Sequence, residues 1–228
     1  MNTSKTPVKL TPLHSAAQRL GATFIEQRGW RIPQVYTTLE DEVVAAQERL
    51  TLADETSNGK LLLEGDQAES VLMDTFDLGS LKINEGHDGI YRLRSDLFFI
   101  STPPGREISI RKKLTTASAA SEQFVTITEV THGRAEIRVI GPHSQELLSK
   151  VCGLDFHPSA FPNETAKQSS LAKTTQLIIR CDIGELPAFS IIGVQSLGPY
   201  VWDTMMEAGT EFGVVPIGRA ALAALGEE

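Results

Sequence analysis

Residues 60–78, KLLLEGDQAESVLMDTFDL, and residues 136–154, EIRVIGPHSQELLSKVCGL, have the same layout. Each stretch predicts a strand, a glycine and then a helix, because an apolar strand pattern gives way to helical spacing at Gly65 and at Gly141. The two glycines coincide at an offset of 76 residues, which is too long for a solenoid repeat. We therefore predict an internal duplication that gives two similar α+β halves. A chance alignment of two common strand–glycine–helix signals is the alternative.

Further elements surround these two units. Helices are predicted at residues 11–21, 37–50, 66–76, 142–153, 198–213 and 219–225, and a helix followed by a small-residue linker at 103–123. Strands are predicted at 22–27, 59–65, 169–181 and 187–194, hairpins at 90–102 and 124–140, and an irregular crossing at 28–36. Because helices and strands alternate irregularly and hairpins occur, we predict an α+β fold rather than a doubly wound parallel sheet.

Polar residues mark the starts of several predicted helices. Thr11 is expected to cap the first helix, ahead of Pro12 in its first turn. Thr37 and Glu40 have the spacing of a capping box in the second helix. Asp66 is expected to cap the third.

The composition is that of an acidic globular protein. The 228 residues are 41% hydrophobic and 22% charged, an ordinary balance in a chain long enough for a sizeable core. A net charge of −8 and a pI near 5.2 argue against nucleic acid, which is bound through basic surfaces. No stretch has the apolar length of a signal peptide or of a membrane span. We expect a soluble, cytoplasmic protein without membrane or nucleic-acid partners.

The sequence lacks the common motifs of catalysis and metal binding. It has no glycine-rich phosphate loop, no nucleophile elbow and no HExxH pair. Its five histidines are scattered without ligand spacing. Cys152 and Cys181 lie too far apart for closely spaced zinc ligands and imply no disulfide framework. We therefore expect no metal site.

One short stretch gathers the side-chain types of acid–base catalysis. Residues 84–89, NEGHDG, contain Glu85, His87 and Asp88 between a helix and a hairpin. Catalytic use would need burial beside a partner that shifts a pKa, and nothing nearby in the sequence supplies an apolar wall. Glycines among polar residues are typical of an exposed turn, which is the interpretation we prefer.

The first sixty residues carry a series of landmarks in a fixed order. They are Thr11-Pro12-Leu13, Gly21-Ala22, Gly29-Trp30, Pro33, Tyr36, Glu42, Asp54 and Gly59-Lys60. This series resembles the opening of the aminomethyltransferases, the T-protein family of the glycine cleavage system, with Ser57-Asn58 in place of the family's His-Met. The resemblance continues through VIGPHSQELL (139–148) and YVWDTMMEAGTEFGVVPIGRAAL (200–222). It covers nearly the whole sequence.

The middle of the sequence is similar to a second member of this group. Residues 154–180, LDFHPSAFPNETAKQSSLAKTTQLIIR, most resemble the gamma subunit of heterotetrameric sarcosine oxidase. The residues that carry this similarity are Leu154-Asp155, His157-Pro158, Ala160-Phe161-Pro162, Gln168 and Leu171-Ala172. Both resemblances imply a duplicated, two-lobed α+β fold of the folate-binding type, which we divide into lobes at 1–115 and 116–228. The family's C-terminal barrel domain is expected to have no counterpart, because the sequence ends at Glu228.

The resemblance also implies a tetrahydrofolate site. In the family, carboxylates hold the pterin, and one aspartate of an Asp-Asp segment ahead of a Val-Tyr-Arg strand is catalytic. Here Ile90-Tyr91-Arg92 matches that strand, but the preceding strand and turn with the aspartate pair are missing. Asp88 is the candidate catalytic replacement. Its backbone context differs, and a catalytic group misplaced by ~1 Å can lose about 100-fold in rate.

The resemblance implies a second folate carboxylate from a Gly-Tyr-Thr-Gly-Glu-Asp-Gly-Phe-Glu-Ile segment, which aligns with DIGELPAFSI (182–191). Glu185 matches the family's Gly-Glu pair, but Ser190 stands where the ligand glutamate is expected. The arginine expected in the last helix is missing, with Arg219 at a different place. The candidate cofactor-binding residues are therefore Tyr91, Glu185 and Ser190.

We predict an aminomethyltransferase-family protein of one-carbon, glycine or sarcosine metabolism, with tetrahydrofolate as cofactor and an eroded catalytic site. Whether it is an enzyme stays open. In one hypothesis it binds folate or another small molecule between its lobes, with Tyr91 and Glu185 at the edge of the cavity. In another it is a non-catalytic accessory subunit of a larger oxidoreductase, such as a sarcosine-oxidase-like flavoprotein, or of a glycine-cleavage-type complex. Active aminomethyl transfer, the third, requires Asp88 or Glu185 to replace the lost groups.

Overall fold

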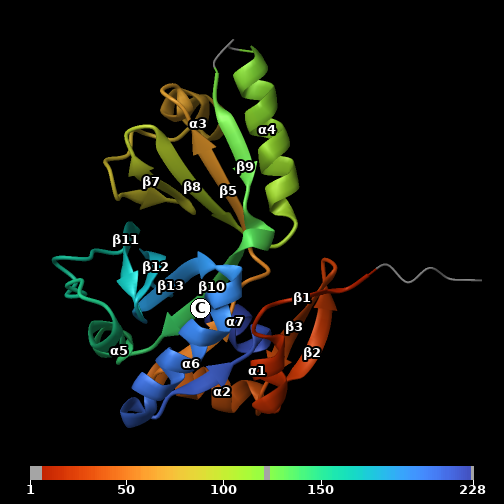
Figure 1. Cartoon of the computed structure of the whole chain (residues 1–228), viewed down its shortest axis with the longest axis vertical. Coiled ribbons are helices and arrows are strands. Elements are labelled where there is room, and N and C mark those ends of the chain that lie inside the picture. Colours follow the sequence, from red (N-terminus) through yellow and green to blue (C-terminus); the bar gives the residue numbers. More distant parts are fainter. Residues whose placement is uncertain (1–6, 121–123, 227–228) are drawn as a thin grey trace, which may run out of the picture.

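The computed structural model describes residues 7–120 and 124–226, which fold into two lobes that meet along a shared boundary (Figure 1). The larger lobe contains a six-stranded sheet in the order β11-β12-β13-β10-β4-β14, in which every neighbouring pair except β4 and β14 is antiparallel. These strands are β4 (Thr51–Asp54), β10 (Arg134–Ile140), β11 (Thr165–Leu171), β12 (Thr174–Arg180), β13 (Ala188–Val194) and β14 (Val215–Ile217). The fold is α+β, as the sequence predicts.

Helices pack on both faces of this sheet. One face carries α1 (His14–Arg19), α5 (Ser144–Val151) and α6 (Gly198–Ala208), and the other carries α2 (Leu39–Glu48) and α7 (Arg219–Leu225) at one end. Side chains alternate along each strand, so Val139 of β10 and Phe189 of β13 join Trp202 of α6 in the core of the first face. Arg138 and Ser190, which pair across β10 and β13, lie on the second face. That part of the sheet is turned toward the smaller lobe.

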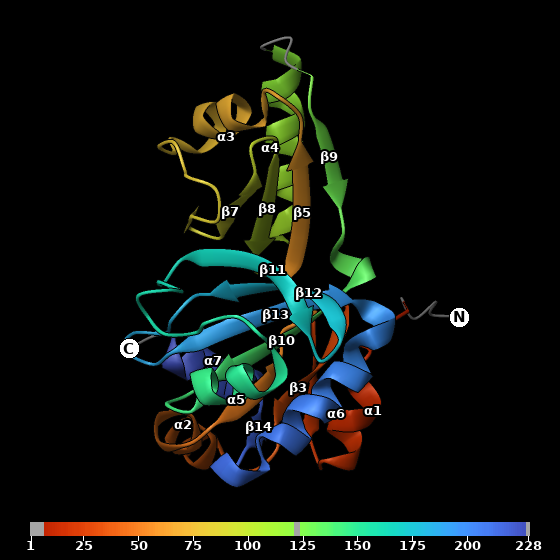
Figure 2. The ribbon, with the colours of Figure 1, turned by 60° about the vertical axis from the view of Figure 1, so that its left-hand side comes forward.

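The smaller lobe contains a five-stranded sheet in the order β6-β7-β8-β5-β9 (Figure 2). Its strands are β5 (Gly59–Glu64), β6 (Gly86–His87), β7 (Ile90–Arg94), β8 (Leu97–Thr102) and β9 (Thr126–Glu129), and its helices are α3 (Ala68–Phe76) and α4 (Arg106–Ala120). Leu61 and Phe98 form a core with Leu114 of α4 on the outer face of this sheet. Tyr91 and Phe99 point to the other face, where they pack against apolar residues of β11, β12 and β13. The two large sheets therefore face each other across the lobe boundary.

A small three-stranded sheet, β1-β3-β2, lies at the N-terminal end of the described chain. Its strands are β1 (Lys9–Leu10), β2 (Thr23–Gln27) and β3 (Trp30–Val35). The expectation of an irregular crossing at 28–36 is wrong, because residues 30–35 form the central strand of this sheet. Pro33 pairs with Phe24 where the register of β2 and β3 shifts. A strand accepts a residue without an N–H donor at such a bulge.

The two aligned strand–glycine–helix stretches both adopt the predicted structure. β5 leads through Gly65 to α3, and β10 leads through Gly141 to α5. Both glycines have positive φ, 144° and 114°, a conformation that strains any L side chain. A Cβ at Gly141 would also collide with the backbone oxygen of Arg49. Each lobe thus contains one such unit, in its own sheet.

Two neighbouring segments carry the chain between the lobes. Residues 55–58 connect β4 to β5, and residues 130–133, with the 3-10 helix η1 (Thr131–Gly133), connect β9 to β10. The predicted hairpin at 124–140 is wrong, because β9 pairs with β5 whereas β10 pairs with β4 and β13. Strands from before and after residue 115 share the six-stranded sheet. The division of the sequence into lobes at 1–115 and 116–228 stays a prediction.

Several predicted helix boundaries differ from the observed ones. Thr38, rather than the threonine before it, caps α2 by accepting from the N–H of Asp41 at 3.1 Å. Thr11 does not cap α1, because its hydroxyl donates to the Asp54 carboxylate. The helix after β5 begins one residue beyond Gln67, with no side-chain cap, so the predicted cap by the preceding aspartate is also wrong. The linker predicted after α4 extends over 121–123, outside the described residues.

Two hairpins are built on two-residue turns. The hairpin predicted at 90–102 is confirmed as β7 and β8, which turn at Ser95-Asp96. The strand predicted at 169–181 is interrupted by a second such turn, because the chain reverses at Ala172-Lys173, where φ is 49° and 60°. Two positive φ values in succession are typical of a type I′ turn.

Candidate functional site

The two lobes border a small, partly open cavity beside the segments that cross between them. Its volume is about 280 Å³, and its walls come from the β4–β5 connection, β7, β8, β10, β12, β13 and the start of α7. Polar groups in its lining include Glu55, Tyr91, Arg138, Ser190 and Arg219. A concave site with a few convergent polar groups is the first place to look for ligand binding. We call it the central cavity.

Arg138 is fixed in the wall of the central cavity and is 8% exposed. Its Nη1 donates to Ser190 Oγ at 2.8 Å, and its Nη2 donates to the backbone oxygen of Cys181. Its Nε lies 3.9 Å from the Glu55 carboxylate. Burial opposes charge on the guanidinium, but the pKa of Arg138 is nevertheless raised because Glu55 and Cys181 favour the charged form. The cavity therefore contains a permanent cation whose plane is set by two hydrogen bonds.

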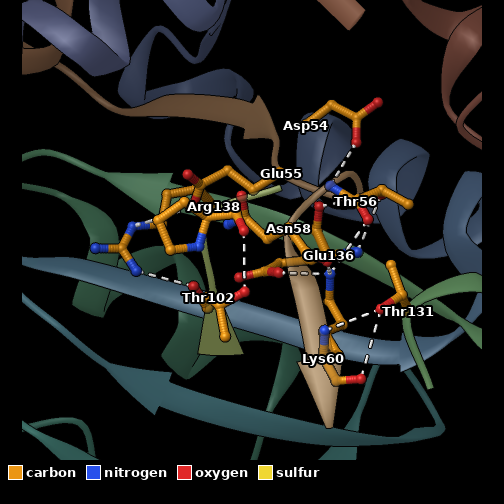
Figure 3. A network of polar contacts seen from close by, with 11 residues as sticks. Asp54, Glu55, Thr56, Asn58, Lys60, Thr102, Thr131, Glu136 and Arg138 are labelled. Atoms are coloured by element: carbon orange, nitrogen blue, oxygen red, sulfur yellow. Dashed lines mark hydrogen bonds and ion pairs between the residues drawn. The ribbon is translucent and has the colours of Figure 1, made fainter. Parts of the chain in front are cut away.

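Lys60 and Glu136 form a buried ion pair beside the cavity (Figure 3). Lys60 Nζ lies 2.8 Å from Glu136 Oε2, and the two side chains are 0% and 2% exposed. The ammonium also donates to the backbone oxygens of Thr56 at 3.2 Å and Asn58 at 2.8 Å. A buried pair offsets its desolvation only when such additional hydrogen bonds satisfy it. The pair anchors the β4–β5 connection to β10.

Hydrogen bonds tie each crossing segment to a neighbouring strand. The Glu136 N–H donates to Thr56 Oγ1 at 3.1 Å, and the N–H of Glu55 donates to the Glu136 oxygen, also at 3.1 Å. On the other side, the Lys60 N–H donates to Thr131 Oγ1 at 3.0 Å. The segment that carries Glu55 is therefore held by strands of both lobes.

Two largely buried carboxylates lie on the β4–β5 side of this network. Asp54 accepts from the Thr11 hydroxyl at 2.5 Å and from the Thr56 N–H at 3.0 Å. Burial raises the pKa of Asp54, and it raises the pKa of Glu55 against the opposing effect of Arg138. Because these pKa values lie above the unfolded ones, their contribution to stability is largest below the unfolded pKa. It is lost as the pH rises through the raised values.

Two of the three candidate cofactor residues meet in the central cavity. Tyr91 is 3% exposed, and burial followed by the neighbouring Cys181 raises the pKa of its hydroxyl, which stays protonated. Ser190 is buried and accepts from Arg138. Glu185 is exposed in the tight turn between β12 and β13 and is not part of the cavity lining.

The stretch 84–89 forms a tight, exposed hairpin. β6 pairs with β7, and the turn residues Asp88 and Gly89 have φ of 47° and 78°, as a type I′ turn requires. The Asp88 side chain is 89% exposed and lies 3.7 Å from His87. It borders a neighbouring cavity of about 560 Å³ rather than the central one. This is the exposed turn that the composition of the stretch favours.

The charged residues of the cavity wall escape the usual motifs. Glu136 and Arg138 are two positions apart between apolar residues of the strand RAEIRVI, which puts them on one face of the sheet. Lys60 directly precedes three leucines in the strand GKLLLE. Because charged side chains are rarely buried without partners, charges at strand spacing within apolar runs are a usable signal. Glu55 gives no such signal, since it lies in a connection.

Neither a metal centre nor a membrane segment is found in the part of the chain that the structure describes. Within residues 7–120 and 124–226, no group of three or more His, Cys, Asp or Glu side chains could hold a metal ion. None of the helices in these ranges combines the length and the apolar character needed to cross a membrane.

Two-lobed domains of this construction occur in solved structures. Aminomethyltransferase T of the glycine cleavage system from Bartonella henselae has a TM-score of 0.82 at 18% identity, covering 96% of this chain and 62% of that one. Heterotetrameric sarcosine oxidase from Corynebacterium sp. U-96 gives 0.67 at 20% identity, covering 90% and 96%. At these identities the similarity establishes the shared fold.

Residues 13–228 match the family model described as the GCVT N-terminal domain, and the chain belongs to this family. It is 26% identical over 231 residues to an aminomethyltransferase of Halothermothrix orenii, with 94% of this chain and 63% of that protein covered. It is 27% identical over 250 residues to the sarcosine oxidase subunit alpha of Corynebacterium sp. strain P-1, with 97% and 26% covered. The chain thus spans only part of these curated relatives. The resemblance to the aminomethyltransferases is confirmed, and these sarcosine oxidase relatives found by sequence are alpha subunits.

Proposed function

We propose that this chain is a tetrahydrofolate-binding domain of one-carbon metabolism that does not itself catalyse aminomethyl transfer. The observation that carries the proposal is the separation of binding and catalytic candidates. Tyr91 and Ser190 are buried residues that line the central cavity, whereas the Asp88 side chain is 89% exposed and borders another cavity. A general acid or base must come within hydrogen-bond reach of the reacting atom. The Asp88 carboxylate, which borders the other cavity, does not meet that requirement for a ligand in the central cavity.

The dimensions and lining of the cavity suit the head of a folate. At about 280 Å³ it is smaller than the ~300–1,000 Å³ of pockets that enclose whole drug-sized ligands. A bicyclic pterin would occupy it, with the tail of the folate outside. Tyr91 keeps a protonated hydroxyl, which is both donor and acceptor. The names of the relatives, aminomethyltransferase and sarcosine oxidase, support a role in glycine or sarcosine metabolism.

Calorimetric titration with tetrahydrofolate tests the proposal. We expect a dissociation constant on the order of micromolar for the wild type, and about 10-fold weaker binding for Tyr91→Phe, which removes one hydrogen-bonding group. Phenylalanine is preferred to alanine, because Tyr91 belongs to the core between the sheets and truncation there would leave a cavity. Tyr200→Phe, on an exposed tyrosine of α6, is the matched control.

Two results would contradict the proposal in different ways. No heat change at millimolar tetrahydrofolate would exclude folate binding. Transfer of an aminomethyl group to tetrahydrofolate by the purified chain would exclude the non-catalytic assignment, and Asp88→Asn would then be assayed for loss of that turnover.

A second candidate function is that of an accessory subunit in a sarcosine-oxidase-like complex. The solved heterotetrameric sarcosine oxidase favours this role, because one of its chains matches the present protein over 96% of its own length. Exposed apolar residues also flank the contact between Pro12 and the start of α6, since Leu10, Leu197 and Tyr200 are 49%, 38% and 48% exposed. Size-exclusion chromatography with a sarcosine-oxidase-type flavoprotein of the same organism tests this. Co-elution that Tyr200→Glu abolishes supports it, and separate elution at micromolar concentration excludes it.

A further inference from the structure

Glu55 and Arg219 line the central cavity, have opposite signs, and have no charged partner within hydrogen-bond length. Glu136 is neutralised by Lys60 at 2.8 Å, and Arg138 donates to two protein oxygens. In contrast, Glu55 lies 3.9 Å from Arg138 Nε, beyond hydrogen-bond length. The Arg219 guanidinium lines the same cavity and makes no hydrogen bond or ion pair within residues 7–120 and 124–226. A carboxylate and a guanidinium without a close charged partner thus border one small space.

Glu55 is held by its backbone, and its carboxylate also has a hydrogen-bond interaction with Asn58. Its N–H donates to the oxygen of Glu136 at 3.1 Å, and its own carbonyl accepts from the Asn58 N–H at 2.9 Å. The side chain is 16% exposed and lies beside Arg138 on the cavity side of the β4–β5 connection (Figure 3). Arg138 and Arg219 favour its charged form, although burial has the larger effect and raises the pKa of Glu55. The carboxylate is held in place with acceptor capacity to spare.

This pair of groups matches the polar edge of a pterin. The 2-amino-4-oxo ring carries two adjacent N–H donors, on the ring nitrogen and the amino group, with a carbonyl oxygen next to them. A carboxylate accepts two parallel N–H donors in one plane, as it does from a guanidinium. The carbonyl needs a donor, which a guanidinium supplies. A ligand with only an apolar face would cover both charged groups without pairing them, at a considerable cost.

We propose that Glu55 is the pterin-binding carboxylate of this chain and that Arg219 donates to the pterin carbonyl. The inference rests on the proposed folate-binding function and names the groups that confer it. Ser190, the position where the family resemblance places a ligand carboxylate, is occupied by its hydrogen bond with Arg138. Glu136 is 2% exposed and paired with Lys60, so it cannot serve instead. The acceptor function has therefore moved from β13 to the β4–β5 connection.

The experiment compares Glu55→Gln with the wild type in calorimetric titrations against tetrahydrofolate, free pterin and 4-aminobenzoylglutamate, the part of folate without the pterin. Gln keeps the shape of Glu but replaces one acceptor oxygen by a donor, so we expect a loss of about 10- to 100-fold in affinity for tetrahydrofolate and pterin. Affinity for 4-aminobenzoylglutamate is expected to stay within about twofold, since no contact of Glu55 is lost. Arg219→Met is expected to weaken pterin binding about 10-fold.

Controls separate this inference from the proposed function. Glu207→Gln changes an exposed glutamate of α6 outside the cavity and is expected to bind like the wild type. Circular dichroism verifies that each variant is folded, and Glu55→Asp, which keeps the charge, is expected to retain more affinity than Glu55→Gln. Wild-type binding that Glu55→Gln leaves unchanged overturns the inference alone. Equal losses for pterin and 4-aminobenzoylglutamate also overturn it, because they indicate general damage. Absence of wild-type folate binding overturns both proposals.

Discussion

Two regions of this molecule contain acidic and basic side chains in close proximity. They differ in solvent exposure and in the distance between their residues along the sequence. The β6–β7 hairpin carries Glu85, His87 and Asp88 within four consecutive residues, with exposed fractions of 46%, 58% and 89%. The wall of the central cavity carries Glu136, which pairs with Lys60 behind it; the two residues are 76 positions apart in the sequence and 2% and 0% exposed. The first group is close in sequence, and the second is close only in the folded chain.

Solvent exposure, more than residue type, determines how strongly these charged side chains affect stability and binding. Water screens the hairpin charges, so each exposed ion pair contributes about 0–1 kcal/mol. In the cavity wall the same charges interact in a poorly screened interior, and removing one partner leaves the other unsatisfied. Burial also raises the pKa of Asp54 and of Glu55, whereas in the hairpin the Lys82 backbone N–H lowers that of Glu85.

The largest expected difference between the regions is in stability. Lys60→Met removes the cation that lies 2.8 Å from the buried Glu136, and we expect a loss of about 3–5 kcal/mol in the free energy of unfolding. The control is Lys82→Met in the hairpin region, where the pair with Glu85 is 86% and 46% exposed. That variant is expected to change stability by less than about 0.5 kcal/mol. Urea unfolding monitored by circular dichroism measures both.

A double variant sharpens the same comparison. Replacing the whole pair, Lys60→Met with Glu136→Leu, is expected to recover most of the lost stability, because two apolar side chains leave no unpaired charge. If Lys60→Met cost no more than its exposed counterpart, the contrast in solvation between cavity wall and hairpin would not hold.

The β6–β7 hairpin is expected to affect stability through its backbone conformation. Gly89 has φ of 78°, and a Cβ there would lie 2.6 Å from the backbone oxygen of Ser101. Gly89→Ala should therefore lower the free energy of unfolding by about 2 kcal/mol, through left-handed strain and the clash. Gly79→Ala is the matched control, because it has no positive φ and no atom near the added Cβ. Equal unfolding free energies for the two variants would refute this.

Local patterns in the sequence predict the helices and strands of this fold better than they predict which strands pair. The two strand–glycine–helix units and the hairpin at 90–102 follow from residues that are neighbours in the chain. The pairing of β4 with β10 and of β9 with β5 joins segments far apart in the sequence, and no local pattern specifies it. Pro33 led to a missed strand, because its tolerance in β3 depends on a shift of register opposite Phe24.

The site is predictable to a smaller extent. Tyr91 and Ser190 were reached through the family resemblance, and they lie in one cavity. Glu55 and Arg219 line one cavity only because the β4–β5 connection and the start of α7 border the same space, which depends on how distant parts of the chain pack. In contrast, the turn chemistry of Asp88 could be interpreted directly, since Asp-Gly between strands is a local signal for a type I′ turn.

The smallest expected effect is that of Asp88→Asn, and it is the most direct test of the hairpin side of the comparison. Asparagine adopts positive φ at least as readily as aspartate, and the side chain is 89% exposed with only His87 nearby. We expect the free energy of unfolding to change by less than about 0.5 kcal/mol and tetrahydrofolate affinity to stay within twofold, while Glu55→Gln reduces it. A loss of 10-fold or more in affinity for Asp88→Asn would mean that the hairpin closes over the ligand. The two regions would then form one site, and the distinction between an exposed turn and a buried binding wall would apply only to the unliganded chain.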